Sequence, residues 1–503
     1  MNSLSRRAAT HSFSALGHVL VALPFLILLA CGGGGPSGPD DDDDGGSIPE
    51  NPGEDLLTIF YTTDERGQIE PGPASEGAAK LMGVWRDVEG LTEDEDFLVL
   101  SGGNSWTGTL LSSWFKGEPV VAVMNAMGYD GMAIGDLDFH FGQAELASRK
   151  AEAEFPLLSS NVRLQSSGAP PSFATPYLVE TVNGLKVGLI GLTPLSTPES
   201  NTSEKTEGLE FRSYADALNQ AVPQARAAGA DFVVVAAHLC YDEITPLLPQ
   251  LGQLGVSMIG GAFCGETKAE VVNGVAVVIP RWGFSEYGKV AIRVKEKSKE
   301  ILGIQAEVKP NTGGSPFEEV EVRVEHWQHQ MEEDLSAVVG YLDTALDQRS
   351  LPLHNFVMDS WINTYDADIG ILNAGAIRAG LPAGDITKGA IVGMLPFTNK
   401  LVELELTGAE VIQCLQGDMI FSGMSTIGGY FNGDGTEMKM DSVYTVLTTD
   451  FLYGQAANAF AGFDDTPKAT EILYSQPTLT YLEALQTSPE NPLDQFLDTD
   501  PRK

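Results

Sequence analysis

Short apolar runs alternate along the chain with longer stretches of helical periodicity. Each run is bounded by turn residues, which is typical of strands buried on both faces of a sheet. The runs in the first half are residues 57–61, 97–100, 187–192 and 232–237. Helix-like stretches separate them, at residues 77–88, 119–127 and 214–228. This alternation predicts a layered α/β domain over residues 55–315.

A second domain is predicted after a polar connector. Residues 316–347 are charged and helix-prone, and we interpret them as a linker helix. Beyond them, the pattern predicts a smaller α/β domain over residues 348–503. It has a helix-like stretch at 353–362 and strand-like runs at 369–372 and 401–406.

The N-terminus has the pattern of an export signal. Residues 1–30 combine a basic start with a short apolar run, and the run ends in Leu-Leu-Ala before Cys31, which resembles a bacterial lipobox. We expect Cys31 to be lipidated. Residues 31–54, with five consecutive aspartates, are expected to form a flexible acidic tether. The folded part should therefore be exported and held by lipid on a bacterial membrane, at the outer membrane or cell surface.

The charge of the chain limits its partners. Its 503 residues carry 69 acidic and 30 basic side chains, a net charge of −39, with 43% hydrophobic and 20% charged residues. These are the values of a globular protein. Such an acidic surface repels a nucleic-acid polymer, but a local basic pocket can still hold a small nucleotide.

Several segments, in order, resemble the 5′-nucleotidase/UDP-sugar hydrolase family. They are residues 57–71 (LTIFYTTDERGQIEP), 121–142 (VAVMNAMGYDGMAIGDLDFHFG) and 373–411, which holds NAGAIR and PFTN. The resemblance implies an N-terminal metallophosphoesterase domain, a four-layer β-sandwich with flanking helices, and a smaller α/β C-terminal domain that binds substrate. It also implies hydrolysis of nucleotide phosphate esters at a pair of divalent metals.

The expected metal-site residues are largely replaced. By the resemblance, Asp64 is a retained ligand, but Arg66 stands at a histidine position. Asn104 replaces the carboxylate that bridges the metals, and an amide is a poorer bridge. Asp136 replaces an asparagine ligand, and Leu137 replaces the catalytic histidine.

Of the remaining positions in the resemblance, one is retained and three are replaced. His238 is retained, whereas Ala262 and Cys264 replace two histidines. His140 occupies the position of the aspartate that supports the catalytic histidine, and it is the only catalytic candidate left. We expect that the phosphoesterase activity is weak or lost.

Two interpretations of this centre remain open at the level of sequence. In one, Arg66 takes the place of a metal and pairs with Asp64 or Asp136. In the other, a single divalent metal, zinc or manganese, is held by Asp136, His238 and Cys264, with Asp64 or Cys240 as a further ligand, and thiolate with imidazole favours zinc.

The cysteines add further alternatives. Cys240 lies two residues after His238, and the resemblance brings its loop close to Cys264. The pair could form a disulfide, bind metal or act as a thiol redox pair. Cys414 is expected in the core.

In the C-terminal domain, the resemblance assigns substrate binding to Asn373 and Arg378, with Phe460 as one of two aromatics around a base. The second aromatic is expected within residues 417–425. Two alternative functions follow: a non-catalytic lipoprotein that binds a nucleotide-like or anionic ligand, and a thiol or zinc protein of altered chemistry.

Overall fold

The computed structural model describes residues 53–72, 75–91, 97–201, 203–454 and 460–503. The predicted signal peptide, Cys31 and nearly all of the predicted tether lie outside the described residues. Among the described residues, no helix is both long and apolar enough to cross a bilayer.

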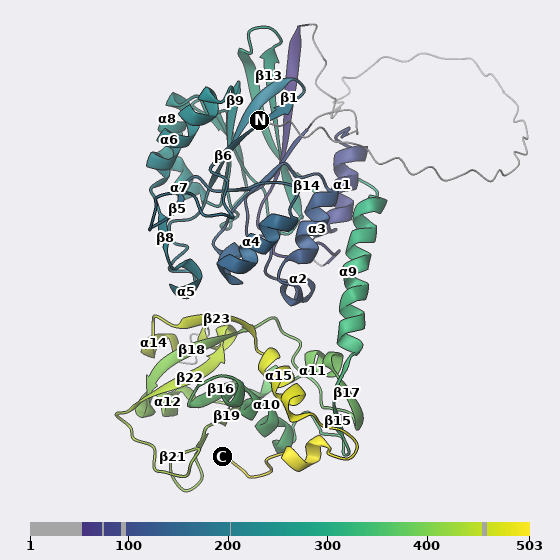
Figure 1. Ribbon diagram of the computed structural model, residues 1–503, viewed down its shortest axis with the longest axis vertical. Helices are drawn as coiled ribbons and strands as arrows, with labels where there is room; N and C mark the ends of the chain where they lie inside the picture. The colour runs from purple at the N-terminus through teal and green to yellow at the C-terminus, as the bar shows by residue number, and fades with distance from the viewer. Residues whose placement is uncertain (1–52, 73–74, 92–96, 202, 455–459) are drawn as a thin grey trace, which may run out of the picture. The chain divides into compact units, whose positions relative to one another are not determined.

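Two mixed β-sheets form the N-terminal domain (Figure 1). The first has the strand order β14-β13-β1-β2-β3-β4: β1 (Glu54–Thr62), β2 (Leu98–Ser101), β3 (Gly131–Ala133), β4 (Leu157–Leu158), β13 (Glu286–Lys295) and β14 (Ile301–Pro310). The second has the order β11-β12-β10-β9-β7-β6: β6 (Tyr177–Val182), β7 (Leu185–Leu192), β9 (Phe232–Ala237), β10 (Met258–Gly260), β11 (Lys268–Val272) and β12 (Val275–Ile279). The central strands of each sheet are parallel.

The alternation of side chains along each strand explains the layers. In β1, Leu57 and Ile59 belong to the core between the sheets, whereas Phe60 belongs to the core under the helices. In β9, Val234 lies between the sheets, and Val235 packs under helices on the other side. Both faces of these strands are buried, so their sequences are continuous apolar runs.

Helices cover the outer face of each sheet (Figure 1). Leu81 and Trp85, four residues apart in α1, point into the core of the first sheet. The helices and 3₁₀ turns of this domain are α1 (Ala78–Asp87), α2 (Leu110–Trp114), α3 (Glu118–Ala126), η1 (Leu137–Phe139), α4 (Gly142–Glu152), α5 (Ser203–Thr206), α6 (Tyr214–Ala227), α7 (Tyr241–Ile244), η2 (Thr245–Leu247) and α8 (Leu248–Gln253). A separate pair joins β5 (Val162–Leu164) to β8 (Leu209–Phe211). The fold is the predicted α/β sandwich.

The predicted linker helix is shorter than expected. Helix α9 (Glu318–Ser336) ends before β15 (Val338–Leu342), which pairs with β17 (Gly384–Thr387). The apolar side chains of residues 338–342 are partly buried against the C-terminal domain. Because these residues pair with β17, they form a strand and do not continue the helix.

The C-terminal domain is built on a sheet with the order β19-β16-β22-β18-β23. Its core contains Trp361 of α10 and Ile371 of β16, both fully buried. The further elements are α10 (Leu351–Thr364), β16 (Ile369–Asn373), η3 (Ala374–Ala376), α11 (Lys388–Met394), β18 (Lys400–Thr407), α12 (Gly408–Cys414), β19 (Met419–Ser422), β20 (Met424–Ser425), β21 (Phe431–Asn432), β22 (Val443–Thr449), α13 (Asp450–Tyr453), α14 (Phe460–Phe463), β23 (Lys468–Leu473), α15 (Gln476–Leu485) and η5 (Leu493–Phe496). Cys414 is buried in this core, as predicted.

Candidate functional site

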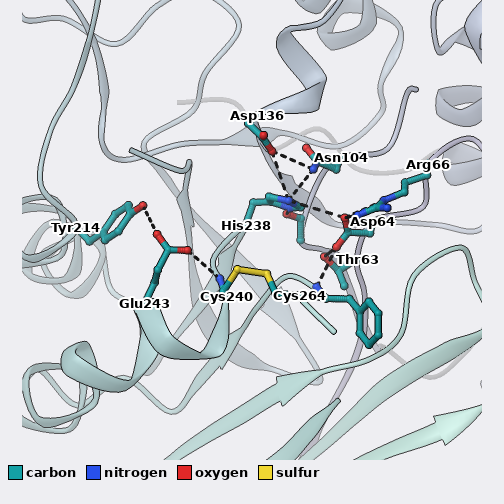
Figure 2. Close-up of a disulfide and its surroundings, with 12 residues drawn as sticks. Thr63, Asp64, Arg66, Asn104, Asp136, Tyr214, His238, Cys240, Glu243 and Cys264 are labelled. Carbon is teal, nitrogen blue, oxygen red and sulfur yellow. Dashed lines mark hydrogen bonds and ion pairs between the residues drawn. A yellow bond between two sulfur atoms is a disulfide. The ribbon is translucent and has the colours of Figure 1, made fainter. Parts of the chain in front are cut away.

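Four candidate residues meet at one edge of the N-terminal sheets. Asp64 follows β1, Asn104 follows β2, Asp136 follows β3 and His238 follows β9. The carboxyl ends of neighbouring parallel strands lie at the same edge of a sheet, so residues far apart in the chain converge there. Figure 2 shows these side chains pointing toward one another. We call Asp64, Arg66, Asn104, Asp136 and His238 the strand-end centre.

Arg66 is bound to Asp64 inside this centre. Its Nε and Nη2 atoms lie 3.1 and 2.7 Å from Asp64 Oδ1. The other carboxylate oxygen of Asp64 accepts a hydrogen bond of 3.0 Å from the backbone N–H of Phe263. Asp64 is 1% exposed and the Arg66 side chain 41%. The buried carboxylate therefore has a cationic partner from its own turn.

Asn104 presents hydrogen-bond donors to the centre. Its Oδ1 accepts from the backbone N–H of Leu137 at 2.8 Å, so the amide group is oriented with Nδ2 inward. Nδ2 lies 3.0 Å from Asp136 Oδ1 and 2.7 Å from His238 Nε2. A Cβ on Gly135 would lie 2.1 Å from Asn104 Oδ1, so only glycine allows this close approach.

His238 has both ring nitrogens in hydrogen bonds. Nδ1 lies 2.9 Å from the carbonyl oxygen of Gly102, which can only accept, so Nδ1 carries a proton. Nε2 then accepts the proton donated by Asn104 Nδ2. Its distances to Asp64 Oδ1 and Asp136 Oδ1 are 3.9 and 3.7 Å. The imidazole lone pair, which would be the metal ligand, is directed at an amide donor.

Backbone conformation is unusual at the same place. Asp64, Arg66 and Asn104 have φ values of 51°, 48° and 59°, in the left-handed region that non-glycine residues seldom occupy. Such conformations cluster at functional sites, where the surrounding structure holds them.

The side chains of the strand-end centre are not arranged as ligands for a pair of divalent metals. A metal needs lone pairs directed at one point, from carboxylates, imidazole or carbonyl oxygens. Here Asp64 is paired with a guanidinium, and Asn104 turns N–H groups toward the centre. Within the described residues, no group of three His, Cys, Asp or Glu side chains could hold a metal ion. The sequence left two interpretations of this centre open. In the first, Arg66 pairs with a carboxylate, and the structure has Arg66 paired with Asp64.

Cys240 and Cys264 form a disulfide, with Cα atoms 5.6 Å apart (Figure 2). Of the three alternatives for this pair, the structure contains the disulfide. The expectation that Cys264 is a metal ligand was wrong for this state, because its sulfur is bonded to Cys240 rather than available as a thiolate. The bond is part of the rim of the centre, since Cys240 lies two residues after His238 and Cys264 directly after Phe263.

His140 does not take part in the strand-end centre. It follows η1, and the centre's side chains make no hydrogen bond to it among the described residues. Burial, followed by the charges of nearby lysines, lowers the pKa of His140 to about 2. An imidazole that stays neutral at ordinary pH does not serve as a general acid there.

Two buried carboxyl groups beside the centre were not predicted from the sequence. Glu65 is fully buried, and its oxygens accept hydrogen bonds from three hydroxyls, those of Thr62 (2.5 Å), Ser101 (2.8 Å) and Ser105 (2.7 Å). Burial raises the pKa of the Glu65 carboxyl. The only signal in the sequence was its place between Asp64 and Arg66.

Asp138 is the second missed carboxyl group. It accepts backbone N–H bonds from Asn104, Ser105 and Gly135 at 2.8–2.9 Å. Burial raises the pKa of Asp138 to about 7. Asp138 therefore holds the turn after β2 against the turn after β3 and so positions Asn104.

A pocket of about 200 Å³ lies in the C-terminal domain at the ends of β16 and β22. Asn373, one of the predicted substrate-binding residues, lines it together with Gly375, Ala376, Phe397, Asn399, Thr449, Phe451 and Tyr474. Arg378 lies beside it, with Cζ 5.9 Å from the centre of the Phe397 ring, and Nη1 donates to the carbonyl of Gly375 at 3.3 Å.

The expectation that Phe460 faces a ligand was wrong. Phe460 is fully buried in the hydrophobic core of the domain. Phe421, within the segment expected to supply the second aromatic, is also buried. The exposed aromatics of the pocket are instead Phe397 and Phe451, which are 45% and 51% exposed. Phe397 lies in the PFTN motif and Phe451 in the short helix α13, and no periodic pattern marks either of them as a pocket residue.

Comparisons with known proteins agree with this architecture. The family model described as "5'-nucleotidase, C-terminal domain" matches residues 337–426. A trifunctional nucleotide phosphoesterase of Bacillus subtilis is 24% identical over 85% of the chain, which spans about a third (34%) of that relative's length. A 5′-nucleotidase of Vibrio cholerae is 24% identical over 82% of the chain and 86% of its own.

Solved structures share the fold. A putative 5′-nucleotidase of Staphylococcus aureus, crystallised with α-ketoglutarate, superposes with a TM-score of 0.59 at 17% identity. The match covers 87% of this chain and 98% of that one.

Proposed function

Because the chain is a divergent relative of the 5′-nucleotidases, we propose that it is a ligand-binding protein of that lineage rather than a phosphoesterase. Its C-terminal domain would bind a nucleotide-like or other anionic small molecule, and its N-terminal domain would not hydrolyse it. The observation that carries the proposal is the pairing of Arg66 with Asp64, beside an Asn104 amide that turns its N–H groups toward Asp136 and His238.

The chemistry of hydrolysis needs groups that this centre lacks. Two-metal phosphoesterases activate water and neutralise phosphate through closely spaced ions. The side chains that would hold such ions bind one another here, and Leu137 stands where the resemblance places the catalytic histidine. A leucine can neither donate a proton nor stabilise a leaving oxygen.

The C-terminal pocket supports binding of an anion. Among the described residues, Arg378 makes no ion pair, although the protein carries a net charge of −39. An arginine without a carboxylate partner in such an acidic protein is a ready site for a phosphate or carboxylate.

The rest of the pocket supports a planar, polar ligand. Within the described part of the chain, the side-chain amides of Asn373 and Asn399 form no hydrogen bond, and both line the pocket. The exposed rings of Phe397 and Phe451 offer apolar faces beside them. Pockets of this kind combine aromatic walls with a few polar groups that orient the ligand.

Export and lipidation at Cys31 are part of the proposal. The Cys240–Cys264 disulfide supports an oxidising compartment, because such bonds are rare in the bacterial cytosol. Growth with a radiolabelled fatty acid should label the wild type but not a Cys31→Ser variant, and label retained by the variant would contradict lipidation.

A phosphoesterase assay tests the first half of the proposal. The purified protein is incubated with AMP and excess manganese or zinc, and phosphate release is followed. We expect release near background. Turnover similar to that of an intact 5′-nucleotidase, lost on Asp64→Ala, would show that the protein is an enzyme.

Calorimetry tests the second half. AMP is titrated into the protein with a chelator present, and we expect binding without metal. Arg378→Gln should weaken it at least about tenfold, the usual effect of removing a charge-assisted hydrogen bond. Arg349→Gln, an exposed arginine of the same domain, is the matched control and should bind as the wild type does. Equal loss in both variants would mean that general charge, not the pocket, holds the anion.

A further inference from the structure

The disulfide joins two loops that lead away from neighbouring strands. Cys240 is in the loop after β9, and Cys264 is in the loop after β10. Strands β9 and β10 are parallel neighbours, so both loops leave the same edge of the sheet. The loop after β9 carries His238, and the loop after β10 carries Phe263, which touches the centre through its backbone.

The second loop holds Asp64 directly. The backbone N–H of Phe263 donates to Asp64 Oδ2 at 3.0 Å, and the N–H of Ala262 donates to the carbonyl of Leu239 at 2.9 Å. The Asp64 backbone carbonyl accepts a hydrogen bond of 2.9 Å from the N–H of Gly283, and its N–H donates to the carbonyl of Gly103 at 2.9 Å. The loop that the disulfide ties down therefore binds one side-chain oxygen of Asp64, while the backbone of Asp64 is bonded to Gly103 and Gly283.

The charge of Asp64 is balanced within the same turn. A buried carboxylate is costly unless it is paired and hydrogen-bonded. Arg66 supplies two N–H groups to Oδ1, and Phe263 supplies one to Oδ2. The Asp64 carboxylate thus has a cationic partner at one oxygen and a backbone N–H donor at the other.

A metal ion bound at the ends of these strands would do two things: join loops from different strands and neutralise the carboxylates among them. We infer that in this protein two features of the chain itself perform these two tasks. The Cys240–Cys264 disulfide joins the loops, and the Arg66 guanidinium neutralises Asp64. The centre is therefore held together without metal, and its order depends on an oxidised disulfide. This inference concerns how the N-terminal domain is built and stands apart from ligand binding by the C-terminal domain.

Amide hydrogen exchange on the full-length, oxidised protein tests the inference. The amide of Phe263 reports on the loop, because it is protected by its bond to Asp64. A chelator should leave its exchange rate unchanged. A phosphine reductant should raise the rate at least about tenfold, because the loop can then open locally while the domain stays folded.

Variants test the contribution of Arg66 and that of the disulfide separately. Arg66→Gln should raise Phe263 exchange by a similar factor with the disulfide intact. Arg281→Gln is its matched control, because Arg281 packs on the Phe263 ring at 5.5 Å without bonding Asp64, and it should have little effect. The Cys240→Ser/Cys264→Ser double variant should exchange fast with or without reductant.

Two results would overturn the inference. Faster exchange on chelation would mean that a metal holds the loops. Unchanged exchange on reduction of the wild type, with loss of the disulfide verified by mass, would mean that the bond does not order the centre. Because the second measurement uses the wild-type chain, it remains decisive if a variant does not fold.

Discussion

Both Arg66 Nε and Arg66 Nη2 donate to the same carboxylate oxygen of Asp64, at 3.1 and 2.7 Å. The two residues are separated by one position and both adopt left-handed backbone conformations, which bring the guanidinium back over the carboxylate. The second Asp64 oxygen is occupied by the Phe263 N–H, so the carboxylate is bound on both sides by protein groups.

A double-mutant cycle should show coupling within this pair. Arg66→Gln leaves a buried, unpaired carboxylate and should reduce the free energy of unfolding by about 2 kcal/mol, below the full cost of a wholly buried pair because Arg66 is partly exposed. Adding Asp64→Asn should restore part of that loss, since the charge is gone. Urea unfolding of the four proteins gives the coupling energy. Additive effects would mean that the pair does not stabilise the centre.

Asn104→Asp should destabilise the protein in a pH-dependent way. The new carboxyl would stand where Nδ2 now donates to Asp136 Oδ1 at 3.0 Å, so two carboxylates would face each other. Repulsion and burial would raise the pKa of the introduced group in the folded state. The variant should therefore be closest to wild type near pH 5 and lose stability as the pH rises to 8. Thermal unfolding at both pH values measures this, and an equal deficit at both would contradict it.

The aromatic pair of the C-terminal pocket should contribute to ligand affinity. Phe397→Ala and Phe451→Ala should each weaken AMP binding about tenfold, because each removes an apolar face of the pocket. Both side chains are about half exposed, so the melting temperature should change little. Phe496→Ala, an equally exposed phenylalanine that does not line the pocket, is the calorimetric control. Unchanged affinity in both pocket variants would place the ligand elsewhere.

Glu89 should stabilise the N-terminal domain only above acidic pH. Its buried carboxylate accepts hydrogen bonds from Lys289 (2.5 Å), Lys309 (2.6 Å) and the Tyr287 hydroxyl (2.5 Å). Burial opposes ionisation, but these donors outweigh it and lower the pKa of Glu89 below its usual 4.5. Its contribution is therefore present above pH 4.5 and lost as the pH falls through the lowered pKa.

The corresponding variant is Glu89→Gln. It should cost about 2 kcal/mol at pH 7 and progressively less below pH 4.5, as measured by urea unfolding across this range. Glu307→Gln removes a more exposed carboxylate from the same Lys309 and should cost less than about 0.5 kcal/mol. A deficit for Glu89→Gln that does not decrease as the pH falls below 4.5 would contradict the assignment.

The helices and strands could be predicted because local sequence decides them. The run at residues 232–237 is apolar at every position, and β9 occupies those residues. Ser213 caps α6 by accepting from the Asp216 N–H, and the predicted helix starts directly after it. The exception was residues 338–342, which were assigned to the linker helix although Val338, Val339 and Tyr341 favour a strand, and which pair with β17 some forty residues further along the chain.

What the sequence determined by itself is which groups are available near the ends of the strands: the carboxylates of Asp64 and Asp136, the Arg66 guanidinium, the Asn104 amide and the His238 imidazole. Only the tertiary structure decided how these groups are used. It oriented Asn104 through the Leu137 N–H and joined Cys240 to Cys264.

The same division holds in the C-terminal domain, where the structure buried Phe460 and left Phe397 and Phe451 exposed. The physical reason is that propensity and periodicity act between near neighbours in the chain, whereas pairing, amide orientation and burial are set by contacts between segments that meet only after folding.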